Sequence, residues 1–167
     1  VHPLIPPLLA GTGGNLDCKD VVAGATLRLP IQVDGALLSV GDTHAAQGDG
    51  EVCGTAIETP LTVRLRATVR RDLTIGAPQI LLPAESERPI DSIGYHITTG
   101  VADNLHDAAR DAVRAMIDHM VNAYGLDPET AYCVCSVAGD LVIAEIVNAP
   151  NVVVAMRWGC RQRGNGT

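Results

Sequence analysis

Aromatic side chains are nearly absent from this chain of 167 residues, at 2% with no Phe. So few rings offer no stacking platform for nucleic-acid bases. Positive charge is scarce as well, because the formal net charge is -7 and Lys19 is the only lysine. The composition therefore argues against a nucleic-acid or anionic-membrane partner.

Long apolar runs are also missing, because Gly, Pro or a charged residue interrupts each one. We therefore expect neither a membrane-spanning helix nor a signal peptide. The five cysteines are an odd number at irregular spacings, which argues against a disulfide framework and favours a reducing compartment. These features predict a cytoplasmic protein.

The hydrophobic fraction of 47% can build one core from Val, Leu, Ile and Ala. No change in composition marks a boundary, so we treat residues 1–167 as a single domain. The chain starts with Val and a Pro-rich stretch, which predicts an extended lead-in over residues 1–12 of a processed or truncated chain. Residues 161–167 are predicted to be a frayed tail.

Short strands are predicted in both halves of the chain, and helices only in the second half. Alternating apolar and polar residues over 61–69 predict a half-solvated antiparallel strand. Prolines at 78, 83 and 89 predict a loop-rich passage. The other predicted strands cover residues 21–33, 36–40 (a buried strand), 92–98, 141–147 and 152–156.

Two helices follow from local signals. Asn104 is a good N-cap ahead of a helical apolar stripe, and Gly125 fits a left-handed C-cap. Asp127 and Pro128 repeat the start signal, so a second helix is expected to run to about Gly139. His106 and His119 then lie on a solvated helix face, whereas His96 is expected to be satisfied locally within a strand.

The run GDTHAAQGDGEVCGTAIE, residues 41–58, carries many chemically active side chains and almost none that could fill a core. On an extended backbone Asp42 converges with His44, and Asp49 converges with Glu51, because residues two apart share a face. Glycines and alanines leave room for a small ligand.

One interpretation is that Asp42 and His44 hold a divalent metal, for which their side chains suit zinc. The alternative is that they only hydrogen-bond within a tight loop. Asp49 and Glu51 could add a ligand or a general base, or could simply belong to a solvated turn.

Cys53 suggests a rival mechanism, in which its thiolate attacks an amide with help from Glu51, Glu58 or Lys19. A cysteine in this position is more often a small buried hydrophobe. Cys133 and Cys135 fall on nearly opposite sides of the second helix and therefore do not form a metal pair.

The run at 41–58, preceded by GGNLDCKDVVAGATLRLPIQVDGALLSV, resembles the acetamidase/formamidase family. The stretches YHITTGVADNLHDAARDAVRAMI and AYCVCSVAGDLVIAEIVNAPNVVVAMR look like later parts of the same family, so the resemblance runs from about residue 13 to 156. It implies a β-rich α+β fold, in which antiparallel strands form a sandwich or barrel-like core with two helices near the carboxy-terminal end.

The resemblance further implies hydrolysis of formamide, acetamide or a related small amide, with lactams also conceivable, and a bound divalent metal. Family members are nearly twice as long, so this chain corresponds to their carboxy-terminal half. The amino-terminal half is then expected as a separate chain, and the complete unit as a homo-oligomer. A non-catalytic subunit or a small-molecule binding module is the alternative outside enzymes.

By position in the matching motifs, the site is expected in GGNLD, GDTH and GDGE. The predicted metal ligands are Asp17, Asp42 and His44, and the predicted catalytic residues are Glu51 as general base and Asp49. The predicted substrate-binding residues are Asn15, Gly48 and Gly50.

Overall fold

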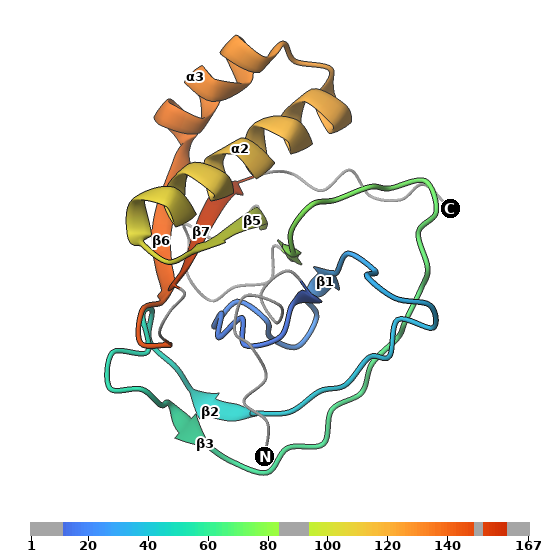
Figure 1. The fold of residues 1–167 in the computed structure, drawn as a ribbon, viewed down its shortest axis with the longest axis vertical. Coiled ribbons are helices and arrows are strands. Elements are labelled where there is room, and N and C mark those ends of the chain that lie inside the picture. The colour runs from blue at the N-terminus through green and yellow to red at the C-terminus, as the bar shows by residue number, and fades with distance from the viewer. Residues whose placement is uncertain (1–11, 84–93, 149–151, 160–167) are drawn as a thin grey trace.

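The computed structural model describes residues 12–83, 94–148 and 152–159, and it has the predicted α+β fold. Two helices accompany a five-stranded antiparallel sheet of order β1-β4-β5-β7-β6 and a two-stranded sheet of β2 and β3 (Figure 1). In chain order the elements are β1 (Thr26–Arg28), β2 (His44–Ala46), β3 (Ile57–Glu58), β4 (Gln79–Leu82), β5 (Tyr95–Ala102), α2 (Leu105–Tyr124), α3 (Pro128–Ala138), β6 (Gly139–Glu145) and β7 (Val152–Gly159).

Both helices begin and end where the local signals place them. The Asn104 side chain accepts a hydrogen bond from the backbone N–H of Asp107. Gly125 ends α2 in the left-handed region with φ of 69°, and Asp127 caps α3. None of the described helices is both long and apolar enough to cross a membrane.

The two helices cover one face of the large sheet (Figure 1). The Thr98 hydroxyl on β5 donates to the Ala112 carbonyl of α2. At Gly100 a Cβ would lie 1.9 Å from the Ala108 carbonyl oxygen, so only glycine permits this approach of helix to strand. The core between them consists of Ala108, Ala112, Met116, Met120, Ala131, Cys135, Val154 and Met156.

The opposite face of the sheet holds a second, smaller core. Leu16 and Cys18 pack there against residues of β4, β5, β6 and β7. This packing fixes the loop of residues 15–20 on the sheet and so sets the position of Asp17.

The predicted strands at 36–40 and 61–69 are wrong, and of residues 21–33 only β1 is a strand. Residues 36–40, predicted to be buried, are exposed. Both segments lie in long connections that run outside the large sheet (Figure 1). A strand requires a neighbour to accept its backbone hydrogen bonds, and these segments have none in the described part of the chain.

Strand β4 lies within the passage that was predicted to be loops. Pro78 precedes it and Pro83 follows it, so both prolines stand outside the ladder, where they cost no hydrogen bond. Strand β5 extends further than predicted, to Ala102, and strand β7 to Gly159. Some predictions concern residues outside the described part of the chain. They are most of the lead-in (residues 1–11), the proline at 89, the start of the strand predicted at 92–98, and the tail at 161–167.

Two histidine predictions are also wrong. The His119 ring stacks on that of His96 with centroids 3.4 Å apart, so it does not belong to a solvated face. His96 is 2% exposed, and its Nε2 has no partner among the described residues, so it is not satisfied locally. Cys133 is exposed and Cys135 is buried, which agrees with their predicted positions on nearly opposite sides of the helix.

Candidate active site

The run at 41–58 folds so that its two ends meet in the β2–β3 pair, where His44 is opposite Glu58. The Asp42 carboxylate lies 3.3 Å from His44 Nε2. Ligand atoms from Asp42, His44 and Glu58 all lie within 4.8 Å of one another. Asp42 and Glu58 also border a surface depression of about 410 Å³.

Two carboxylates and one imidazole form a donor set that suits a divalent cation such as zinc. The site therefore fits a metal on the chemistry of its side chains. From the sequence, Glu58 was considered only as a residue that could assist Cys53 in the cysteine mechanism, and not as a metal ligand. Its position opposite His44 comes from the pairing of β2 with β3, which the sequence did not reveal.

Glu51 lies beside this group and is 8% exposed. Its Oε1 is 4.0 Å from His44 Nε2. Burial raises the pKa of the Glu51 carboxyl, and the negative charge of Asp17 raises it further. The backbone is fixed just before it, where the Gly50 N–H donates to the Ala144 carbonyl at 3.0 Å.

Asp17 reaches the same region from the loop on the sheet. Its Oδ2 accepts a 2.6 Å hydrogen bond from the Asn148 amide, and its carbonyl accepts one of 2.7 Å from Gln47. Burial raises the pKa of Asp17, while the Asn148 hydrogen bond opposes this, and the nearby Asp42 raises it further. The charges of Asp42 and His44 therefore act on the Asp17 carboxyl in opposite directions.

Glu145 is a buried carboxylate that sequence reasoning missed. It is 1% exposed, and its Oε1 accepts the backbone N–H groups of Val147 and Asn148. Burial raises the pKa of the Glu145 carboxyl, these two backbone hydrogen bonds oppose the shift, and the charge of Asp17 contributes to it. From the sequence, residues 141–147 were predicted only to form a strand. No local signal indicated that this strand, β6, ends beside Asp17 and Glu51.

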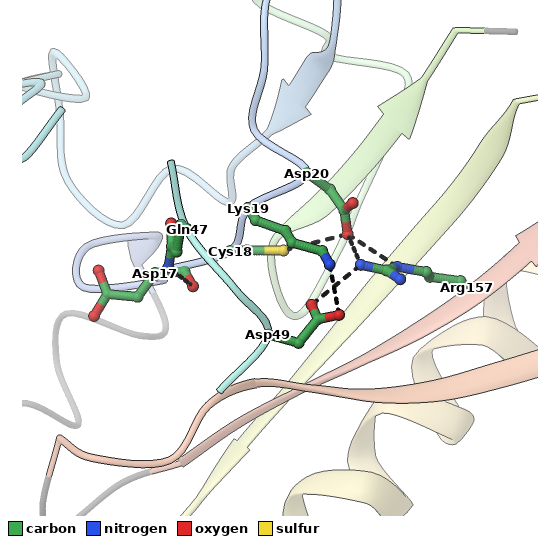
Figure 2. A network of polar contacts seen from close by, with 7 residues as sticks. All are labelled: Asp17, Cys18, Lys19, Asp20, Gln47, Asp49 and Arg157. Carbon is green, nitrogen blue, oxygen red and sulfur yellow. Dashed lines mark hydrogen bonds and ion pairs between the residues drawn. The ribbon is translucent and has the colours of Figure 1, made fainter. Parts of the chain in front are cut away.

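Asp49 and Glu51 do not converge, contrary to the i, i+2 expectation. Asp49 forms ion pairs with Lys19 at 2.7 Å and with Arg157 at 3.4 Å (Figure 2). Glu51 instead has its Oε1 4.0 Å from His44 Nε2. The reason is the backbone, because φ is 86° at Gly50 and 44° at Glu51, which is not an extended conformation.

The network around Arg157 joins three parts of the chain (Figure 2). Its guanidinium contacts Asp20 at 2.6 Å and Asp49, so β7 is tied to the loop at 15–20 and to the run at 41–58. Cys18 also lies in this network, and burial raises the pKa of its thiol to about 12. This cluster therefore holds loops in place and leaves a thiol that is inert near neutral pH.

Four of the predicted site residues have positive φ without being glycine. The values are 50° at Asn15, 41° at Asp17, 58° at Asp42 and 44° at Glu51. Such conformations cost on the order of 1 kcal/mol each and are often found where a site requires a particular side-chain direction. Asn15 is exposed and lies two residues before Asp17.

Cys53 is exposed, so the prediction of a small buried hydrophobe is wrong. Its thiol donates to the Thr55 carbonyl at 3.3 Å. Cys53 and Gly48 both line a second depression of about 500 Å³. Lys19, which the cysteine hypothesis invoked, is ion-paired with Asp49.

The described residues thus define an α+β protein in which several carboxylates and one histidine gather beside an antiparallel sheet. Residues 4–158 match the model of the Acetamidase/Formamidase family. The chain therefore belongs to this family, as the sequence motifs indicated.

Individual relatives agree with this assignment. A formamidase of Methylophilus methylotrophus is 28% identical over 158 residues, which cover 86% of this chain and 38% of that protein. The crystal structure of an acetamidase from Bacillus halodurans matches with a TM-score of 0.74 and 34% identity, over 87% of this chain and 45% of the other. The crystal structure of an acetamidase from Yersinia enterocolitica matches with a TM-score of 0.73 and 29% identity, over 90% of this chain and 42% of the other. This chain therefore spans less than half the length of each of these relatives.

Proposed function

We propose that this chain carries the reactive site of a metal-assisted hydrolase, which converts a small aliphatic amide such as formamide or acetamide to a carboxylate and ammonia. The names of its relatives, acetamidase and formamidase, support this reaction class. The observation that carries the proposal is the group of Asp42, His44 and Glu58, with the buried Glu51 beside it.

Asp42, His44 and Glu58 would together hold the metal, for which we propose zinc. A bound zinc ion lowers the pKa of its water to about 7 and polarises a carbonyl. Asp17 is proposed as a further ligand, oriented by Asn148. Asn15, Gly48 and Gly50 are proposed to contact the amide.

Glu51 is proposed as the general base. A carboxylate must have its pKa raised toward neutrality to take a proton efficiently, and burial shifts Glu51 in that direction. Asp49 has the same chemistry but is neutralised by Lys19 and Arg157. We therefore assign the proton transfer to Glu51. Asp49 is proposed to stabilise, through its ion pairs, the loop that carries Glu51.

The test is ammonia release from formamide and acetamide by the native protein as purified from its source, with elemental analysis of the same sample. We expect stoichiometric zinc, loss of activity with a chelator, and recovery when zinc is returned. Glu51→Gln is expected to reduce turnover about 10²- to 10⁴-fold. Glu129→Gln, the same change at an exposed site on α3, is the matched control.

The cysteine mechanism and the non-catalytic alternative predict different results. Full activity in Cys53→Ala removes the thiolate hypothesis, whereas loss of activity in a folded protein would support it against ours. Metal-free, chelator-insensitive activity would refute the metal. Failure of the intact assembly to hydrolyse formamide, acetamide, propionamide or a small lactam would favour a binding module.

We also propose that the complete unit is a homo-oligomer. Light scattering measures the mass of the assembly and so tests this proposal.

A further inference from the structure

Six large apolar side chains on the two long connections are exposed to solvent. We call this set the apolar strip and define it by Leu37, Leu38, Val40, Leu61, Val63 and Leu65, which are between 46% and 78% exposed. No hydrophobic residue from Val21 to Val69 belongs to the buried core. Many large apolar side chains left exposed on neighbouring positions of the chain are typical of an interaction surface.

Residues 61–69 have the sequence pattern of a strand that lacks only a neighbour. Leu61, Val63 and Leu65 alternate with polar residues, the pattern of a sheet with one buried face. The segment belongs to no sheet of the described part of the chain. An extended edge of this kind is completed when another polypeptide adds a strand beside it.

The size of the relatives indicates which polypeptide this is. This chain fits the acetamidase of Bacillus halodurans over 87% of its own length but over only 45% of that protein. More than half of the relative thus lies outside the match. A part of that size can cover the strip, whereas this chain's own sheet lies elsewhere (Figure 1).

A second copy of this chain is a poorer occupant. In antiparallel self-pairing of residues 61–69 with the apolar faces matched, the registers that pair the most residues are centred on Arg64, Leu65 or Arg66, and each places an arginine directly opposite an arginine. A register centred on Val63 avoids this but pairs only residues 61–65. Like charges in directly opposed positions destabilise a sheet pair.

We propose that the apolar strip is the docking surface for a polypeptide that supplies the remaining, amino-terminal half of the acetamidase/formamidase fold. That polypeptide places a strand beside residues 61–69 and buries the strip. The proposal rests on family membership and on the exposed surface, and it does not depend on the chemistry proposed above.

The probe is the part of the Bacillus halodurans acetamidase outside the match, produced as a separate polypeptide and mixed with the full chain. Light scattering is expected to give a complex in which the two polypeptides are present in equal numbers, and hydrogen exchange at the amides of 61–69 is expected to slow on binding. Val63→Asp is expected to weaken binding about tenfold or more. Val137→Asp, the same change at an 83% exposed position on α3, is expected to leave it unchanged.

Three results would overturn the proposal. The first is the absence of a complex while circular dichroism shows both polypeptides folded. The second is protection of amides 61–69 in the monomeric chain alone. The third is self-association that Val63→Asp abolishes, which would assign the strip to a second copy. A complex that forms but releases no ammonia counts against the proposed function alone.

Discussion

Residues 94–159 and residues 21–72 differ sharply in how their apolar side chains are used. The first region buries Met116, Met120 and Met156 between α2 and the sheet. In the second region, which we call the arm, Leu37 is 78% exposed and Leu65 is 58% exposed. Both regions contain many apolar residues, but only the first packs them into a core, while the second leaves them on an open surface. The difference shows that packing depends on the partner elements available and not on hydrophobicity alone.

Truncating one large side chain in each region should give the largest contrast. Met116→Ala creates a cavity in a fully buried site, and we expect a loss of about 2–5 kcal/mol in the free energy of unfolding. Leu65→Ala, in the arm, is expected to change it by less than about 0.5 kcal/mol in the isolated chain. Urea denaturation followed by circular dichroism measures both. Equal losses would mean that the arm is packed in solution.

Acidification should weaken the compact region through its stacked histidines. Burial, together with His119 and the charge of Arg28, lowers the pKa of His96 to about 3, and burial together with Arg28 lowers that of His119 to about 4. The unfolded chain, with histidine pKa values near 6.5, therefore binds protons that the folded chain does not bind. Stability is then retained above about pH 6.5 and falls as the pH decreases below it.

We expect a loss on the order of 1 kcal/mol per pH unit from His96, and less from His119, which solvent screens. Asp17, Glu51 and Glu145 have raised pKa values and act in the opposite direction, so wild type must be compared with variants. Urea midpoints between pH 6.5 and 5 should fall less steeply in His119→Gln than in wild type. His106→Gln, at an exposed site on the same helix, should keep the wild-type slope.

The smallest contrast concerns surface polar contacts. Asn104→Ala removes the N-cap of α2, and we expect a loss of about 1 kcal/mol. In the arm, the hydrogen bonds from Arg70 lower the pKa of Asp72 to about 2, yet both groups are fully exposed. Asp72→Asn should therefore leave the melting temperature unchanged. A clear decrease would show that this ion pair holds the arm in a defined conformation.

The helices could be predicted because their signals are local. Asn104, Gly125 and Asp127 satisfy backbone groups within one turn, so no distant segment is needed. The predicted strand at 61–69 could not be judged in that way, since a strand is stable only beside another. The alternation is present in the sequence, but it does not say whether or from where a partner strand is supplied.

The candidate site likewise has a part that local sequence could indicate and a part that it could not. The chemistry and close spacing of the side chains in residues 41–58 led us to predict Asp42, His44 and Glu51 as site residues. The sequence could not reveal that Gly50 turns Asp49 toward Lys19, because this depends on the φ values of two residues. Nor could it reveal Glu145, which reaches the site only through the packing of β6.

The hydrogen bond from Asn148 to Asp17 joins residues 131 positions apart in the chain. Closing so long a loop has a large entropic cost, and contacts of high sequence separation form slowly during folding. The helices, whose contacts are local, can form well before this bond does. The candidate site is therefore expected to be assembled among the last parts of the molecule, so that a folding intermediate with native helices would still lack it.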